Sequence, residues 1–427
     1  MSFEAGCLGA SRALRKPLAA AKAPCARRHG GFARGALPLF PFRPEGDRAV
    51  PEATEIFVPA AHGSDWEHIA PAEARFDAGR LQEAVAFAQS HESPWPRSLF
   101  YPDGTYVGNR EWNESGPWTE IVGPVAERGG PAGLILKGGR IVAEWGDTTR
   151  TDMTFSIAKS YLSVLTGLAV DDGLIRDVEE PVGESVDDPL FSGPHNGKVT
   201  WRHLLQQSSE WQGEIFGKSD QVDHNRQIGP GADNSRKGQR RELREPGTFY
   251  EYNDVRVNVL GYALLRLFRR PLPEVLRERI MDPIGASSDW RWEGYSSSFV
   301  QIDGKRLQSV PGGGHWGGGL FIGARDHARF GLLIGRKGEW NGRQLVSRGW
   351  IERSLTPSPT LGNYGYLWWL ARGPAARTNV PETAFSALGA GSNVIWVEPR
   401  QDIVAVLRWI EGASTEGFVD RLLAARV

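Results

Sequence analysis

The stretch TFSIAKSYLSVLTGLAVDDGLI, residues 154–175, predicts a long buried helix over residues 157–171 because apolar residues dominate it. Thr154 or Ser156 can begin this helix, since a hydroxyl side chain suits the position that caps a helix N-terminus. Ser156 and Lys159 stand three positions apart and therefore share one helical face. The stretch thus brings a hydroxyl, an amine and unpaired backbone N–H groups together at one helix end.

These groups are the parts that a nucleophilic serine needs. A serine hydroxyl attacks a carbonyl after a base takes its proton, and a lysine can be that base when its pKa falls toward neutrality. The apolar run after Lys159 indicates burial, which together with nearby positive charge would lower the pKa of its amine. The helix N-terminus would favour a developing oxyanion. The simpler interpretation, a polar start to a core helix, stays open on this stretch alone.

Two tyrosines precede a second predicted helix, over residues 255–268, in the segment EPGTFYEYNDVRVNVLGYALL, residues 245–265. A tyrosine delivered to the serine–lysine pair could pass the proton to a leaving group. Either Tyr250 or Tyr252 could instead be a packing aromatic, and the segment alone does not distinguish these roles.

Small residues precede a predicted strand in the segment FSALGAGSNVIWVEP, residues 385–399. Residues without bulky side chains allow a backbone N–H to approach a bound carbonyl closely. The alternative is a plain tight turn into an edge strand.

Motifs of several other catalytic classes are missing from the sequence. It contains no G-x-S-x-G, no H-E-x-x-H and no P-loop. The glycine-rich run GGHWGGGLFIGA, residues 313–324, lacks the Lys-Ser/Thr ending of a phosphate-binding loop. We therefore expect chemistry that uses neither a metal nor a cofactor.

The remaining pattern predicts an α/β (α+β) fold with one antiparallel sheet built from both chain ends. Residues 132–147 predict a hairpin that turns at Gly138-Gly139, and residues 392–410 predict a second strand pair joined at Pro399-Arg400-Gln401. The pattern also predicts flanking helices and a mainly helical lobe inserted into the sheet lobe. The flanking helices are predicted at 76–90, with Asp77 as N-cap, and at about 416–426, and a further helix is predicted at 200–207. The sheet lobe is predicted to comprise about 70–155 and 312–427, and the helical lobe about 156–311.

Composition limits the classes of partner. The 427 residues carry a formal net charge of −1, with 40% hydrophobic and 24% charged residues, which is typical of a soluble globular protein. This balance argues against nucleic acid or an anionic membrane as the main partner. We expect a cytoplasmic protein, because the sequence has neither a stretch that would span a bilayer nor a clear secretory signal.

Residues 1–55 differ from the rest and are predicted to be a basic, disordered extension of the domain at 56–427. They are rich in Ala, Gly, Pro and Arg and have no acidic residue between Glu4 and Glu45. A targeting peptide and a start codon assigned too early are the alternatives. The two cysteines of the chain, Cys7 and Cys25, both lie in this segment, which excludes a disulfide framework in the body of the chain.

Four motifs in this order resemble those of the serine β-lactamase and penicillin-binding protein superfamily: SIAK, PGTFYEYND, GGGHWGGGLFIGARDHARFGLL and GAGSNVIWVEP. The resemblance covers roughly residues 70–427 and is nearest to class C-like esterases and 6-aminohexanoate-dimer hydrolases. It implies that Ser156 is the acyl-forming nucleophile, Lys159 its general base and Tyr252 the proton shuttle. It also implies an oxyanion hole made of the backbone N–H groups of Ser156 and Ala390.

Two departures from the family pattern bear on the substrate. Asp254 stands where the Tyr-x-Asn motif has its asparagine, and Ala387-Leu388-Gly389 stands in place of Lys-Thr-Gly. In the family, that lysine helps to bind the carboxylate of penicillin-like substrates. Its replacement argues against an efficient β-lactamase and fits an esterase or amidase with a less anionic substrate. The resemblance makes Tyr250 a weaker candidate than Tyr252.

The sequence therefore predicts a serine hydrolase that cleaves a small-molecule ester or amide through a Ser156 acyl-enzyme. Asp254, Trp211, Trp316 and Gly389 are the predicted substrate-binding residues. The alternatives are a D-amino-acid peptidase, a weak β-lactamase, a penicillin-binding-type sensor without turnover and, as a poorer one, a metal-dependent hydrolase. The natural substrate and the oligomeric state stay open.

Overall fold

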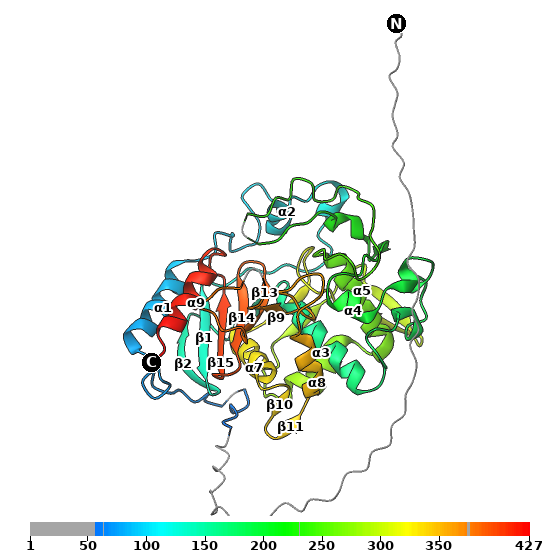
Figure 1. The fold of residues 1–427 in the computed structure, drawn as a ribbon. Coiled ribbons are helices and arrows are strands. Elements are labelled where there is room, and N and C mark those ends of the chain that lie inside the picture. The colour runs from blue at the N-terminus through cyan, green and yellow to red at the C-terminus, as the bar shows by residue number, and fades with distance from the viewer. Residues whose placement is uncertain (1–55, 63, 230, 374–375) are drawn as a thin grey trace, which may run out of the picture. The chain divides into compact units, whose positions relative to one another are not determined.

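The main sheet joins strands from both ends of the described chain in the order β12-β13-β14-β15-β1-β2, with every neighbouring pair antiparallel (Figure 1). This computed structural model describes residues 56–62, 64–229, 231–373 and 376–427, so the predicted extension at 1–55 and its cysteines lie outside the described residues. The strands of the sheet are β1 (Ala132–Lys137), β2 (Arg140–Trp145), β12 (Trp369–Leu370), β13 (Phe385–Gly389), β14 (Asn393–Glu398) and β15 (Ile403–Arg408).

The sheet confirms the predicted fold class. β1 and β2 form the expected hairpin, and Gly138 and Gly139 at its turn have φ of 60° and 82°, which favour glycine. β1 also pairs with β15, with Leu134 opposite Val406, and this pairing joins the two ends of the described chain.

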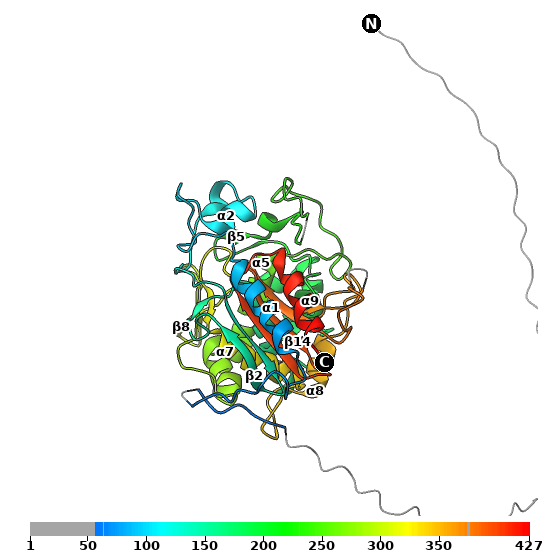
Figure 2. The same ribbon diagram turned by 90° about the vertical axis from the view of Figure 1, so that its left-hand side faces the viewer.

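Helices cover both faces of the sheet. Val394 and Trp396 pack in the cluster with α1 (Ala78–Ser90) and α9 (Ser414–Ala424), whereas Ile395 and Val397 pack in the cluster with α7 (Ala324–Gly335). This alternation follows the period of two along a strand, and cover on both faces explains why β14 and β15 are buried throughout. Figure 2 shows α1 and α9 side by side over the sheet.

The predicted helices are present, with changes at some ends. The Asp77 side chain accepts a hydrogen bond from Arg80 N at 2.8 Å and caps α1, as expected. The helix predicted at 200–207 is shorter, because Gln207 has a φ of 54° and leaves the helical region. The last helix begins at Ser414 rather than near 416.

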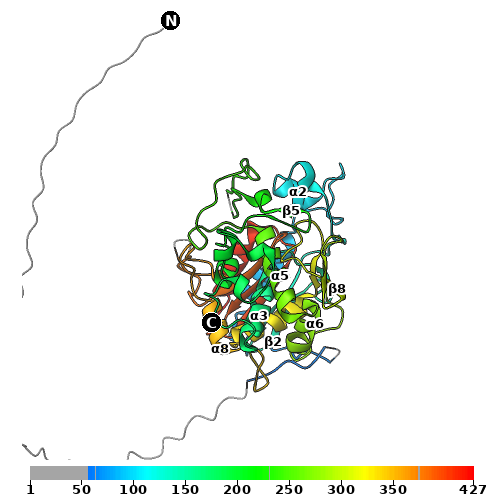
Figure 3. The same cartoon turned by 90° about the vertical axis from the view of Figure 1, so that its right-hand side faces the viewer.

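Most of the regular structure between residues 156 and 311 is helical, and α3 (Ile157–Asp171) packs against α5 (Asp254–Phe268) there (Figure 3). Within the described residues, no helix is both long enough and apolar enough to cross a membrane. The other helices are α2 (Val107–Glu111), α4 (Trp201–Leu205), α6 (Leu272–Leu276) and α8 (Arg348–Ser354), and the short strands are β3 (Asp152–Met153), β4 (Glu214–Ile215), β5 (Lys218–Ser219), β6 (Arg291–Glu293), β7 (Phe299–Ile302), β8 (Lys305–Gln308), β9 (Gly319–Ile322), β10 (Glu339–Trp340) and β11 (Arg343–Gln344).

Candidate active site

Ser156 lies at the N-cap of α3, just after the short strand β3. Its side chain makes no capping hydrogen bond, and Lys159 Nζ donates to its Oγ at 2.9 Å. Ser156 is partly exposed, whereas the Lys159 side chain is only 2% exposed. The predicted pair is therefore formed, between a partly exposed serine and a buried lysine.

The residue before the serine has an unusual backbone. Phe155 has a φ of 49°, a left-handed conformation that is unfavourable for residues with bulky side chains and costs about 1–3 kcal/mol. Its buried ring makes edge contacts with the rings of Trp95, Trp112 and Trp409. This packing holds the sharp turn that carries the chain from β3 into α3 and sets the position of Ser156.

The end of β13 lies against the start of α3. A Cβ at Gly389 would come within 2.1 Å of Thr154 O and 3.3 Å of Ile157 N, so only glycine permits this approach. The next residue, Ala390, is held by Asn393 Nδ2, which donates to Ala390 O at 2.7 Å. The structure thus brings the two residues predicted to form the oxyanion hole to neighbouring positions of the fold, and Gly389 serves this close approach.

Lys159 is fully hydrogen-bonded in the interior. Besides Ser156 Oγ, its Nζ donates to Asp254 Oδ1 at 2.5 Å and to Gly312 O at 3.2 Å, so each ammonium proton has an acceptor. Burial by itself lowers the pKa of Lys159, but the charge and hydrogen bond of Asp254 and the Tyr252 phenol outweigh it and raise the pKa. The expectation of a lowered pKa was therefore wrong, because it left out the carboxylate beside the amine.

Asp254 belongs to the support of Lys159. Its carboxyl is 6% exposed and accepts hydrogen bonds from Lys159, from Arg226 Nη1 at 2.7 Å and from His315 Nδ1 at 2.8 Å. Burial alone would raise the pKa of Asp254, but the charges of Lys159 and Arg226 and the contact with His315 hold it well below the ordinary value. The prediction that Asp254 binds substrate is corrected here: its oxygens are already occupied by internal partners.

Tyr252, and not Tyr250, adjoins the lysine. The ring centroid of Tyr252 is 4.8 Å from Lys159 Nζ, and the ring of Trp369 stacks on that of Tyr252 with centroids 6.3 Å apart. The Tyr250 hydroxyl is buried without a hydrogen-bond partner among the described residues, and burial raises the pKa of this phenol well above its usual range. Of the two candidates, Tyr252 is the one whose ring lies beside Lys159.

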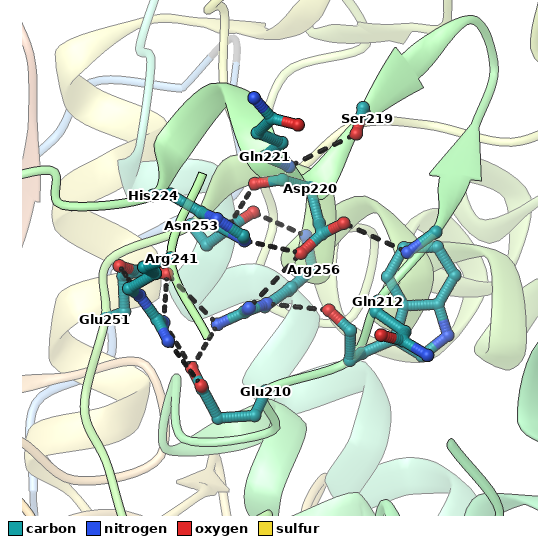
Figure 4. Close-up of polar contacts among 12 residues, drawn as sticks. Glu210, Gln212, Ser219, Asp220, Gln221, His224, Arg241, Glu251, Asn253 and Arg256 are labelled. Atoms are coloured by element: carbon teal, nitrogen blue, oxygen red, sulfur yellow. Dashed lines mark hydrogen bonds and ion pairs between the residues drawn. The ribbon is translucent and has the colours of Figure 1, made fainter. Parts of the chain in front are cut away.

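A second buried ionic cluster holds the segment that carries Tyr252 (Figure 4). Arg241 binds Glu210 through two hydrogen bonds of 2.6 Å, and Arg256 donates to Glu210 at 2.8 Å. Although burial alone would raise it, the bonds and charges of these arginines lower the pKa of Glu210 to about 2. Asn253, which follows Tyr252 and is the N-cap of α5, donates to Asp220 O at 2.9 Å. This hydrogen bond links the cluster to the segment that carries Tyr252.

A hollow of about 880 Å³ lies against this second cluster. Ser156 is not among the residues that line it. Its lining residues are Gln212, Gly213, Glu214, Ser219, Asp220, Gln221, His224, Arg240, Arg241, Glu242 and Leu243.

The two tryptophans predicted to line a cleft lie in the core instead. Trp211 and Trp316 are each 0% exposed. Trp211 Nε1 donates to Leu190 O at 2.8 Å, and Trp316 Nε1 donates to Trp118 O at 2.8 Å. Large indole rings suit a core as well as a cleft, and here their polar atoms find backbone partners inside the protein.

One cluster of potential metal ligands adjoins the site, and an amine already occupies it. Ligand atoms of Glu114, Asp223 and His315 lie within 4.8 Å of one another. Lys237 Nζ bonds the Glu114 carboxylate and lies 3.3 Å from Asp223 Oδ1. Because this ammonium supplies the positive charge that a metal ion would bring, we assign no metal to these residues.

The sequence interpretation missed the partners of Asp254, namely Arg226 and His315. A signal was available, since an aspartate in place of the motif's asparagine requires a compensating cation when it is buried. Which cation it would be could not be read from the sequence, because position 226 lies in a loop and 315 in the glycine-rich run.

Comparison with known families now identifies the class of protein. The family model described as Beta-lactamase matches residues 119–421, and the chain therefore belongs to the β-lactamase family. This result confirms the resemblance to the serine β-lactamase and penicillin-binding protein superfamily. The residue pair, the tyrosine and the close approach of β13 described above all lie within the matched range.

Particular relatives agree with this class. The chain is 24% identical over 307 residues to the 6-aminohexanoate-dimer hydrolase of Paenarthrobacter ureafaciens, covering 64% of this chain and 70% of that protein. A solved penicillin-binding protein homologue from Caulobacter crescentus matches at 15% identity and a TM-score of 0.53, covering 85% of this chain and 100% of the other. The octameric penicillin-binding protein homologue from Pyrococcus abyssi matches at 18% identity and a TM-score of 0.50, covering 82% and 77%. The two solved structures share the fold of this chain.

Proposed function

We propose that this protein is a serine hydrolase that cleaves an ester or amide bond of a small molecule through an acyl-enzyme on Ser156. The observation that carries the proposal is the 2.9 Å contact between Lys159 Nζ and Ser156 Oγ at the start of α3. A base within hydrogen-bond reach of a partly exposed hydroxyl is the arrangement that nucleophilic serine catalysis requires.

Lys159, as the neutral amine, takes the proton of Ser156 while Oγ attacks the carbonyl carbon. The oxyanion receives the backbone N–H groups of Ser156 and Ala390. Tyr252 relays this proton from Lys159 to the leaving alcohol or amine as the bond to the leaving group breaks. Water then attacks the acyl-enzyme, which releases the acid and returns a proton to Ser156 Oγ.

The surroundings of the serine favour an uncharged substrate. Ala387, at the position of the family's substrate-binding lysine, is 1% exposed, and its neighbour Leu388 is 36% exposed. Partly buried aromatic rings, Trp112 and Trp369, contact Phe155 and Tyr252 respectively. We propose an ester or an amide that needs no cation at position 387, rather than an anionic β-lactam; a relative of this chain is named 6-aminohexanoate-dimer hydrolase.

The experiment is covalent labelling with a fluorophosphonate together with hydrolysis of a p-nitrophenyl ester. Wild type should be labelled and should show a burst, and Ser156→Ala should show neither. Ser163→Ala is the matched control, because Ser163 is a buried serine of the same helix whose hydroxyl has no partner in the described part of the chain. Labelling that persists in Ser156→Ala would refute the assignment.

A substrate panel separates the alternatives. Short esters, aminohexanoate oligomers, D-peptides and nitrocefin should be compared at one pH. Nitrocefin turnover near that of the best ester would revive the β-lactamase, and labelling without product release would favour a sensor. Activity that is lost in EDTA would favour a metal-dependent enzyme.

A further inference from the structure

His315 is a buried histidine that lies between two carboxylates. Its Nδ1 is 2.8 Å from Asp254 Oδ2 and its Nε2 is 2.6 Å from Glu114 Oε1, while the His315 and Glu114 side chains are each 1% exposed. A neutral imidazole has one N–H and would turn a lone pair toward one of these carboxylates. Only the imidazolium form donates to both.

Other charges surround this histidine. Arg226 bonds Asp254, and Lys237 bonds Glu114; both cations also contact Asp223 Oδ1, at 3.2 and 3.3 Å respectively. The remaining neighbours are Trp316, which stacks on the imidazole at 3.9 Å, Lys218, whose Nζ is 5.1 Å from the Trp316 ring, and Trp112, whose ring is 4.6 Å from the imidazole.

The charges of this cluster balance in two ways. Glu114, Asp223 and Asp254 supply three negative charges, and Arg226 and Lys237 supply two positive ones. The third positive charge can stand on Lys159 or on His315, since both bond Asp254. If His315 is the imidazolium, the buried carboxylates are matched while Lys159 is an uncharged amine.

We propose that His315 is a positioning residue that enables Lys159 to act as a base. Held as an imidazolium between Asp254 and Glu114, it supplies the positive charge that Asp254 would otherwise take from Lys159. The amine form of Lys159 then becomes available to receive the Ser156 proton. The positive charge of His315 and the pKa of Lys159 are thus linked through Asp254. The role of this linkage in catalysis rests on the proposed function, whereas the linkage itself depends only on the buried charges.

Titration of the Lys159 amine tests the linkage without any need for turnover. The full chain, labelled with ¹³C at the lysine side chains, is titrated by NMR in wild type, His315→Asn and Asp254→Asn, with Lys159→Arg to assign the signal. In His315→Asn, where a buried positive charge is lost, the midpoint should rise by about one to two pH units. In Asp254→Asn, where the carboxylate is lost, the midpoint should fall.

His224→Asn is the matched control. His224 is 4% exposed and bonds one carboxylate, Asp220, at 2.8 Å, outside the cluster around Lys159. Its substitution should leave the Lys159 midpoint within a few tenths of a pH unit. His315→Gln is a second variant for the case that His315→Asn does not fold, as judged by circular dichroism. Its midpoint should rise in the same way.

The pH profile of fluorophosphonate labelling gives the second measurement. In His315→Asn the rising limb of the labelling rate should move to higher pH by the same amount, with the rate recovered in alkali. An equal loss at every pH, or a Lys159 midpoint that does not move, would overturn the proposal. If the midpoint moves as expected but wild type is never labelled on Ser156, the linkage stands and the proposed function fails.

Discussion

Two buried ionic clusters lie in the helical part of the molecule, and they differ in the cations that they use. The cluster of Figure 4 binds Glu210 with Arg241 and Arg256, whose guanidinium groups stay charged at any pH the protein meets. The cluster beside Ser156 also contains an arginine, Arg226, but adds Lys159 and His315, which can lose a proton. Permanent charges suit a structural role, and groups that can exchange protons suit a site where a proton must move.

The histidines of the two clusters differ in the same way. His224 bonds one carboxylate and leaves its Nδ1 without a partner in the described chain, so the neutral ring satisfies it. His315 bonds two carboxylates and needs both ring protons. We therefore assign a structural role to the cluster of Figure 4 and a proton-exchanging role to the cluster beside Ser156.

Removal of the nucleophile should have the largest effect. Ser156→Ala should lower the rate of p-nitrophenyl ester hydrolysis by about a thousandfold or more, since the proposed covalent step depends on the Ser156 hydroxyl. Stopped-flow absorbance measures the burst and the steady state. Ser163→Ala, in the same helix, should keep both, and a burst in Ser156→Ala would contradict the account.

Glu210→Ala should break the structural cluster. The substitution removes one of the two carboxylates that Arg241 and Arg256 share, the other being Glu251, and loss of one partner of a buried ion pair costs about 3–5 kcal/mol of unfolding free energy. Urea denaturation measures this loss. The folded fraction should keep the Lys159 titration of wild type, and a displaced midpoint would show that the clusters are not separate.

Substitution of the two tyrosines should affect the acylation rate to different extents. Tyr252→Phe should lower the acylation rate by about a hundredfold, because the ring that contacts Lys159 would lose its hydroxyl. Tyr250→Phe removes a hydroxyl that has no hydrogen-bond partner among the described residues, and it should change the rate less than about threefold. Comparable losses in both variants would mean that Tyr252 has no special role.

The pH dependence should change the acylation rate by about tenfold for each pH unit. Asp254 raises the pKa of Lys159, so the amine is the minor form at neutral pH and its fraction grows about tenfold for each pH unit below that pKa. The acylation rate should therefore rise with pH through neutrality. Rates measured between pH 6 and 10 with one ester decide this, and a rate that falls over this range would contradict the assignment of Lys159 as base.

The helices of the site could be predicted because their signals are local. The apolar run after Ser156 and the pattern after Asn253 each correspond to one helix, with α3 at the predicted bounds. Asp254 was recognised as a departure, but its partners Arg226 and His315 come from distant loops. The direction of the Lys159 pKa and the burial of the two tryptophans depend on such distant contacts, which spacing along the chain does not encode.

The central claim is that Ser156 forms a covalent acyl-enzyme with Lys159 as its base. The most direct measurement is mass spectrometry of the protein quenched in acid during turnover of a p-nitrophenyl ester, followed by peptide mapping. The account predicts a mass increase of one acyl group on the peptide that contains Ser156, absent from Ser156→Ala. An acyl group on another residue, or turnover of the ester with no adduct on Ser156, would contradict it.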